Sequence, residues 1–159
     1  MIVRPEIEDY AAASGLYPVD RAVERVAAAV ESASALGFPF VLTARAENHI
    51  RGNPDLSDTI ARLQAYERAG ADVLYAPGLV TADEISAVCS AVTRPVNVLA
   101  VPGLSLAEIA AAGATRVSVG GALTWVAARA FLDAATAIRD SGDFSALAAR
   151  VPLGDLLGA

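Results

Sequence analysis

Short apolar runs alternate with helix-forming segments along most of this chain, and this alternation restricts its fold more than any other feature. Each apolar run is too short to be a helix, and each segment between the runs carries its apolar residues at helical spacing. The expected strands end near Ile7 and cover residues 38–44, 71–76, 96–100 and 116–119. The expected helices cover residues 20–36, 56–69, 82–93, 106–112 and 123–138, with a further turn or two over residues 144–149. The aromatic residues Tyr66, Tyr75, Trp125 and Phe131 fall on apolar faces and are expected in the core.

Residues with known capping preferences stand at the starts of several of these helices. Asp20 is a predicted N-cap for the first helix, and Thr81 for the third. Ser105 followed by Glu108 is typical of a capping box, in which each residue satisfies a backbone N–H near the other. These patterns support the helix boundaries independently of the apolar spacing.

The order of strand and helix predicts an α/β protein with about five parallel strands. Helical connections of this length require parallel pairing, because the chain must return to the same edge of the sheet before each new strand. Such units build either an open doubly wound sheet or part of a (β/α)₈ barrel, and periodicity alone does not separate the two. No linker or low-complexity stretch divides the 159 residues, so we expect a single domain over residues 1–159.

The charge of the chain argues against two classes of partner. Its net charge is -6, and its basic residues form no cluster, so nucleic acid and anionic membrane are poor partners. Charges follow the N-terminus too soon for a signal peptide, and no long uncharged apolar run follows. We therefore expect a soluble, cytoplasmic protein.

Ligands of parallel α/β folds meet the carboxyl ends of the strands, so polar residues at those ends are the candidates for chemistry. At the first end stand Glu8 and Asp9, adjacent carboxylates after Ile7. One of them could hold a hard cation such as Mg²⁺, which takes one or two carboxylates plus water. The alternative is a solvated acidic turn.

At the second end, Arg45 follows an otherwise apolar strand. A guanidinium there needs a partner, and its planar fork suits a substrate carboxylate. Glu47, two residues on, is expected to share its side and hold it. The alternative is an internal ion pair of Arg45 with Glu47 or Glu8 and no ligand. His49 is either a general base or an exposed loop histidine.

The third and fourth places are Asn97 and the pair Gly120 and Gly121. Asn97 interrupts an apolar strand, and a buried amide needs partners, so it either ties neighbouring strands together or lines a cavity. The glycine pair opens on the last long helix, where it is either a phosphate-binding turn or a plain tight turn. A phosphate-binding barrel of another family is a weaker hypothesis that rests on this turn.

Four ordered segments resemble the isocitrate lyase/phosphoenolpyruvate mutase family. They are residues 7–9, 40–47, 65–72 and 95–98, and residues 116–120 continue the resemblance. The family implies an eight-stranded barrel, a bound Mg²⁺ and cleavage or rearrangement of C–C or P–C bonds in 2-oxo acids and their relatives. It also implies dimers or tetramers that exchange their last helix.

Carried over residue by residue, the resemblance assigns Glu8 to the metal and Arg45 to the substrate. It places Glu47 and Asn97 in the same site. A histidine of the phosphoenolpyruvate mutases has no counterpart, because Ala76, Pro77 and Gly78 occupy its position, which argues against phosphonopyruvate chemistry.

The family's paired metal aspartates and its Lys-Cys lid loop belong to strands that precede its counterpart of Glu8, where only seven residues stand here. We therefore expect a partial TIM (β/α)₈-type barrel that resembles the last five βα units. One hypothesis is an oligomeric Mg²⁺-dependent lyase that cleaves a C–C bond of a small 2-oxo or 2-hydroxy carboxylic acid through an enolate, with cleavage of a P–C bond as the weaker form of this hypothesis. The alternative is a catalytically inactive, truncated barrel that acts as a binding or oligomerisation module.

Overall fold

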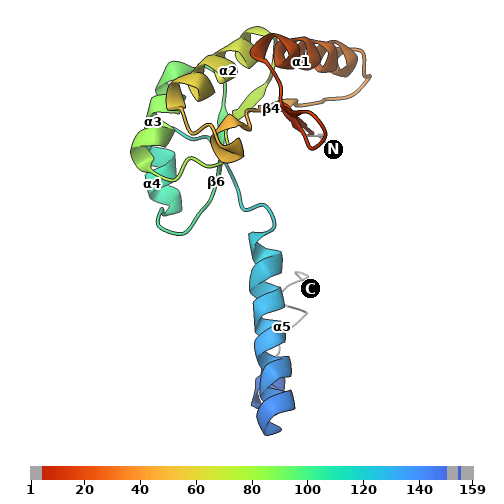
Figure 1. Cartoon of the computed structure of the whole chain (residues 1–159), viewed down its shortest axis with the longest axis vertical. Coiled ribbons are helices and arrows are strands. Elements are labelled where there is room, and N and C mark those ends of the chain that lie inside the picture. Colours follow the sequence, from red (N-terminus) through yellow and green to blue (C-terminus); the bar gives the residue numbers. More distant parts are fainter. Residues whose placement is uncertain (1–4, 150–153, 155–159) are drawn as a thin grey trace. The chain divides into compact units, whose positions relative to one another are not determined.

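The structure is a computed structural model that describes residues 5–149 and residue 154. The chain divides into two compact units, one up to Ser118 and one from Val119 on. The first unit holds a sheet with its helices, and the second is dominated by one long helix (Figure 1). We describe each unit by itself, and the expectation of a single domain stays a prediction.

The first unit is built on a five-stranded parallel sheet. Its strands are β1 (Glu6–Glu8), β4 (Thr43–Arg45), β5 (Val73–Tyr75), β6 (Val96–Leu99) and β7 (Arg116–Ser118). They lie side by side in chain order, as successive βα units of a barrel do. The predicted fold class is confirmed.

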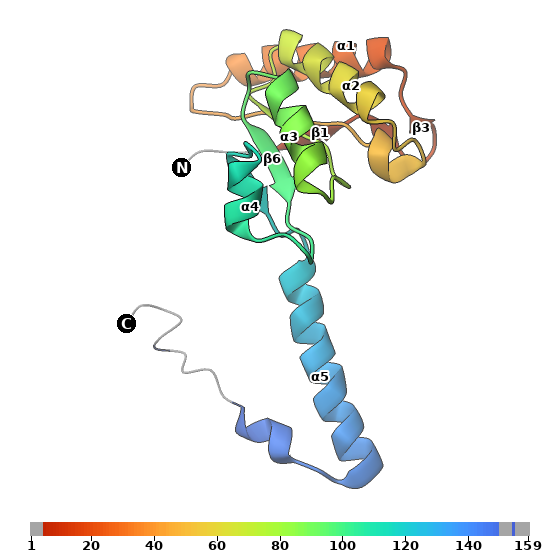
Figure 2. The same ribbon diagram turned by 90° about the vertical axis from the view of Figure 1, so that its left-hand side faces the viewer.

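Four helices connect these strands and cover one face of the sheet (Figures 1 and 2). They are α1 (Val19–Ser34), α2 (Leu56–Arg68), α3 (Ala82–Ala91) and α4 (Leu106–Ala111). A short 3₁₀ helix, η1 (Asn48–Arg51), follows β4. A hairpin of β2 (Tyr10–Ala11) and β3 (Gly15–Leu16), absent from the sequence prediction, follows β1.

Alternate residues of the strands form the core with the helices. Ala44, Leu74 and Val98 point to the helices and are buried against side chains such as Leu63 and Ile85. Because side chains alternate along a strand, the residues between them point to the opposite face. That face carries polar side chains.

Both predicted caps in the middle of the chain are confirmed. Thr81 and Ser105 each accept a hydrogen bond from the backbone N–H three residues on, and Glu84 and Glu108 complete the two capping boxes. Asp20 is not the N-cap, contrary to the prediction, because the helix begins earlier than expected and Pro18, two residues before Asp20, takes that place. Asp20 lies in the first turn and accepts a hydrogen bond from the N–H of Arg21.

The strand predicted over residues 38–44 is shorter and later than expected. Regular pairing covers only Thr43–Arg45, and Phe38 is half-exposed. Pro5 on the neighbouring strand and Pro39 on this one lack the N–H groups that would extend the ladder toward their amino ends.

The second unit holds α5 (Ala122–Ser141) and the short η2 (Ser145–Ala148). None of the side chains of α5 is buried, and Trp125 and Phe131, predicted as core, are 76% and 72% exposed. The prediction was wrong because α5 carries apolar side chains on all sides and η2 is too small to cover them. Among the described residues, no helix has the length and apolar character needed to cross a membrane.

Candidate functional site

One residue from each strand of the sheet lies in a row on the face that the helices leave free. Backbone register pairs Glu8 with Arg45, Arg45 with Tyr75, Tyr75 with Asn97 and Asn97 with Arg116. Residues in register on parallel strands point to the same face, so these five form one polar row. The sheet therefore brings three of its predicted site residues, Glu8, Arg45 and Asn97, to a single face.

Arg45 is surrounded by carboxylates. Its Nη1 lies 3.5 Å from both Glu6 Oε2 and Glu8 Oε1, and its Nε donates to Glu47. Its guanidinium also lies over the ring of Tyr75, 5.1 Å from the centroid. Burial opposes the charge of Arg45, but the hydrogen bond to Glu47 and the charges of Glu47 and Glu8 outweigh it and raise the pKa of the guanidinium. The site thus holds a permanent cation.

Glu47 is fully buried between two arginines. Besides Arg45, it accepts hydrogen bonds from Arg51, whose Nε and Nη2 lie 2.9 and 2.8 Å away. Arg51 is itself stacked 3.9 Å from the centroid of Tyr10 in the hairpin. The prediction that Glu47 lies beside Arg45 is confirmed, and Arg51 shares the carboxylate.

Asp9 is buried and bound on the helix side of the sheet, away from the polar row. Its Oδ1 accepts from the N–H of Glu47 at 2.7 Å, and its Oδ2 accepts from Arg62 Nη1 at 3.0 Å and from the hydroxyl of Tyr66 at 2.5 Å. Burial, together with the hydrogen bond to Asp9, raises the pKa of Tyr66, so its phenol stays protonated. Of the two adjacent carboxylates, only Glu8 faces the polar row.

Asn97 ties neighbouring strands together, which is the first of the two interpretations that its sequence position allowed. Its Nδ2 donates to Ser118 Oγ at 3.1 Å, which ties β6 to β7. Its Oδ1 is buried, and no donor from the described residues reaches it. A buried acceptor without a donor is rare, so Oδ1 is an unsatisfied atom within the polar row.

The described residues do not build a metal site. Residues 5–149 and 154 contain no group of three metal-ligating side chains. Glu8, the predicted ligand, lies 3.5 Å from the Arg45 cation, which opposes a second positive charge at the same carboxylate.

His49 and the glycine pair lie outside the polar row. His49 belongs to η1, is half-buried rather than exposed, and packs against Gly78, with its Nδ1 shielded and unpaired by described residues. Gly121 is the N-cap of α5, and Gly120 has a φ of +51°. The glycine pair belongs to the second unit.

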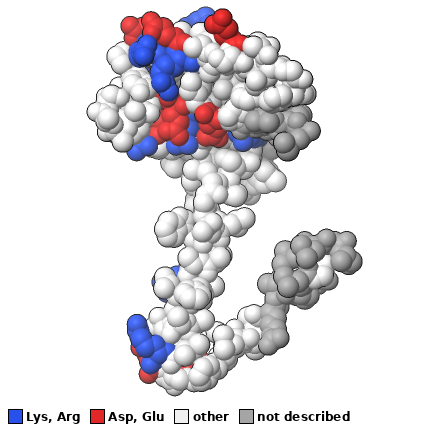
Figure 3. Space-filling view, turned by 90° about the vertical axis from the view of Figure 1, so that its right-hand side faces the viewer, with Lys and Arg blue, Asp and Glu red and all other residues white. Residues whose placement is uncertain are grey.

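Two members of the site escaped the sequence analysis. Glu6 shares the face of Glu8 because residues two apart on a strand point the same way, a signal that was present in the sequence. Arg116 pairs with Glu6 at 3.8 Å, and only the curvature of the sheet brings these two edge strands together. Figure 3 shows charged side chains of both signs in contact on the first unit.

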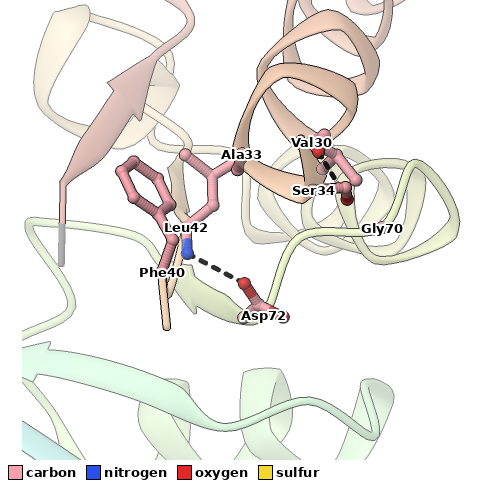
Figure 4. Close-up of a pocket in the computed structure, with 7 residues that line it drawn as sticks. All are labelled: Val30, Ala33, Ser34, Phe40, Leu42, Gly70 and Asp72. Carbon is pink, nitrogen blue, oxygen red and sulfur yellow. Dashed lines mark hydrogen bonds between the residues drawn. The ribbon is translucent and has the colours of Figure 1, made fainter. Parts of the chain in front are cut away.

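A surface hollow of about 210 Å³ lies elsewhere in the first unit (Figure 4). It is lined by Val30, Ala33, Ser34, Phe40, Leu42, Gly70 and Asp72. Asp72 accepts a hydrogen bond from the N–H of Leu42 there, at 2.9 Å. These residues precede β4 and β5, so the hollow lies at the amino ends of these two strands, whereas Arg45 and Tyr75 are their last residues.

Comparison with known proteins identifies a matching family and a similar sequence. Residues 2–139 match the family model described as phosphoenolpyruvate phosphomutase. An uncharacterized protein of Mycobacterium tuberculosis is 38% identical over 71 residues, which cover 45% of this chain and 28% of that protein.

Among solved structures, a candidate lyase/mutase from Burkholderia cenocepacia is 54% identical with a TM-score of 0.91, covering 98% of this chain and 58% of that one. A phosphonopyruvate hydrolase, solved with oxalate and Mg²⁺, is 27% identical with a TM-score of 0.76 and the same coverage of 98% and 58%. The chain thus spans less than two thirds of the length of these relatives.

The Asp9 network yields a stability prediction. Asp9→Asn removes the charge that Arg62 and Tyr66 share in a buried setting, so we expect the free energy of unfolding to fall by about 3 kcal/mol. Glu8→Gln, one residue away but 41% exposed, is the matched control and should change it by less than about 1 kcal/mol. Urea denaturation followed by circular dichroism measures both, and equal effects would contradict the structural role of Asp9.

Proposed function

Because the chain belongs to the isocitrate lyase/phosphoenolpyruvate mutase family, we propose that it acts on a small 2-oxo or 2-hydroxy carboxylic acid whose carboxylate binds Arg45. The supporting observation is the position of Arg45, a permanent cation at the carboxyl end of a strand, on the free face of the sheet. A carboxylate matches the fork of a guanidinium in shape and charge.

The partners of Arg45 divide into fixed and exchangeable ones. Glu47 is fully buried and shared with Arg51, so it orients Arg45 and stays in place. Glu6 and Glu8 are 32% and 41% exposed and lie at 3.5 Å, too far for strong hydrogen bonds. A substrate carboxylate would replace one of these two weak contacts. The similar phosphonopyruvate hydrolase was solved with a carboxylate ligand, oxalate.

Asn97 supplies the second contact in this proposal. Its unpaired Oδ1 would accept a hydrogen bond from a substrate hydroxyl next to the carboxylate held by Arg45. In C–C cleavage of a 2-hydroxy acid, a base takes the hydroxyl proton, the carbon that bears the oxygen becomes a carbonyl, and the electron pair of the broken bond passes to the leaving fragment as an enolate. We assign the described residues to binding and orientation of the acid and none of them to the base. Ala76, Pro77 and Gly78 in place of the mutase histidine favour C–C cleavage over P–C chemistry.

The Mg²⁺ of the family would need ligands beyond those described here. Glu8 is one carboxylate of the one or two that Mg²⁺ usually takes, and it is paired with Arg45. In our proposal, the described residues bind and orient the acid.

Arg45→Ala tests carboxylate binding. We expect the affinity for oxalate and pyruvate to fall at least tenfold, about 1.4 kcal/mol, because their charge loses its counterion. Stability should stay within about 2 kcal/mol of the parent, because Arg51 still neutralises Glu47.

Isothermal titration calorimetry measures the binding, with Arg68→Ala as control, since Arg68 is exposed at the end of α2. Unchanged binding in Arg45→Ala, or a much larger loss of stability, would favour the internal ion pair. Binding of acids without turnover would match the alternative of a binding module.

Titration with Mg²⁺ alone gives a separate result. We expect no binding at micromolar Mg²⁺, since the described carboxylates of the polar face are engaged by arginines. Calorimetry on the full chain checks this. Stoichiometric binding in that range would overturn our account of the carboxylates.

We also propose that the chain forms a homo-oligomer through α5. This helix carries large apolar side chains that nothing in its own unit covers, and helices that are apolar all round are normally buried.

Light scattering after gel filtration should give at least a dimer. In the double variant Trp125→Ser, Phe131→Ser, the measured mass should fall toward that of the monomer. The control variant Phe38→Ser, in the first unit, should keep the mass of the parent chain. A parent chain that is monomeric at all concentrations would contradict self-association and indicate that the same chain covers α5.

A further inference from the structure

We propose that Arg51 is a positioning residue of the carboxylate site, which acts through Glu47 and keeps the guanidinium of Arg45 available to a ligand. The inference rests on the proposed function of Arg45 as the carboxylate contact. It adds a residue beyond the carboxyl end of β4 to which neither the sequence pattern nor the comparisons assign a role.

Glu47 divides its two oxygen atoms between two arginines. Its Oε1 accepts a hydrogen bond from Nε of Arg45, and its Oε2 accepts one from Nε of Arg51 at 2.9 Å. Nη2 of Arg51 also lies 2.8 Å from Oε2. The side chain of Glu47 has no exposed surface, so these arginines take the place of water around it. Arg51 thereby limits Glu47 to a contact with Arg45 through one oxygen.

Removing Arg51 would change the way in which Glu47 holds Arg45. Oε2 would lose the donors that it has now, and a buried carboxylate oxygen without a donor is costly. The other arginine paired with Glu47 is Arg45, and a carboxylate and a guanidinium readily form two parallel hydrogen bonds. Glu47 would then occupy a second N–H group of Arg45, and a ligand carboxylate would have to compete for it.

Arg51 also supplies charge to the site. Glu47 carries one negative charge and lies between two cations, so this group of three has a net charge of about +1. Without Arg51, the charges of Glu47 and Arg45 would cancel. Glu6 and Glu8, each 3.5 Å from Nη1 of Arg45, would then leave negative charge in excess around it. A ligand carboxylate would be repelled where it is now attracted.

The hairpin after β1 holds Arg51 in this position. The guanidinium of Arg51 lies 3.9 Å from the centroid of the Tyr10 ring in β2. Stacking on a ring uses the face of a guanidinium and leaves the N–H groups at its edge for Glu47. The side chain of Arg51 is 37% exposed, so the ring is what restricts an arginine that water could otherwise draw away.

Arg51→Met tests the inference, because it removes the charge and the hydrogen bonds and keeps most of the apolar length of the side chain. We expect calorimetric titration with pyruvate to show binding at least fivefold weaker than that of the parent. Arg51→Lys should bind pyruvate within twofold of the parent, because its ammonium group still pairs with Glu47.

Arg25→Met is the matched control. Arg25 also lies over a tyrosine ring, 5.0 Å from the centroid of Tyr17, but it belongs to α1 and is not one of the two arginines paired with Glu47. Pyruvate binding should change less than twofold in this variant. Unchanged binding in Arg51→Met, an equal loss in Arg25→Met, or binding in Arg51→Lys as weak as in Arg51→Met would overturn the inference.

A double-mutant cycle shows whether Arg51 acts through Glu47. In the Glu47→Gln background the side chain carries no charge for Arg51 to share, so adding Arg51→Met should weaken pyruvate binding less than twofold. The same loss in both backgrounds would mean that Arg51 contacts the ligand itself, and the positioning role would be wrong.

Should a variant of Arg51 or Glu47 fail to fold, Tyr10→Leu decides. It leaves every charge in place and removes the ring that fixes Arg51, so pyruvate binding should weaken at least threefold. Tyr17→Leu is its control and should keep the affinity of the parent. Parent-like binding in Tyr10→Leu overturns the inference.

The same titrations separate this inference from the proposed function. If the parent does not bind pyruvate, or if Arg45→Ala binds it like the parent, the proposed function fails and this inference with it. If Arg45→Ala loses pyruvate while Arg51→Met keeps the affinity of the parent, only the role of Arg51 is wrong.

Discussion

The candidate site depends on one buried carboxylate, Asp9, which lies on the helix side of the sheet and not in the polar row. Asp9 accepts hydrogen bonds from the backbone of Glu47, from Arg62 and from Tyr66, and so joins the end of β1, the segment after β4 and helix α2. Removing such a charge from water costs several kcal/mol unless its lone pairs are filled, and here they are. With the backbone of Glu47 fixed, its side chain can hold Arg45 at the edge of the polar row.

Charge balance explains why the free face of the sheet tolerates so many ionised groups. Glu6, Glu8 and Glu47 meet Arg45, Arg51 and Arg116, so three negative and three positive charges lie within one network. The pairs grade from fully buried at Glu47 to half-exposed at Glu8. The buried Glu47 orients Arg45 and Arg51. The more exposed Glu6 and Glu8 make longer contacts, which a ligand could replace.

The sequence predicts those parts of the molecule that local interactions determine. Both capping boxes and the meeting of Arg45 with Glu47 depend on residues two or three positions apart, and the alternation of strands and helices follows from local apolar spacing. The different fates of Glu8 and Asp9 could not be predicted, because the partners of Asp9, Arg62 and Tyr66, stand more than fifty residues away.

The pair of Glu6 and Arg116 escaped for a similar reason, since it depends on the curvature of the whole sheet. Prediction also erred at Trp125 and Phe131, where apolar character indicates burial but does not say what covers the side chain. The periodic spacing of apolar residues shows which helix faces are apolar. It does not show which segment covers such a face, because that depends on contacts between residues far apart in the sequence.

Glu8 and Asp9 are consecutive in the chain yet serve opposite sides of the sheet, one toward the polar row and one toward α2. A slip of β1 by one residue would exchange them, placing Asp9 before Arg45 and Glu8 among the side chains of α2. The longer glutamate would then have to fit a space shaped for aspartate. The register of β1 therefore decides both which carboxylate is buried against α2 and which one faces Arg45.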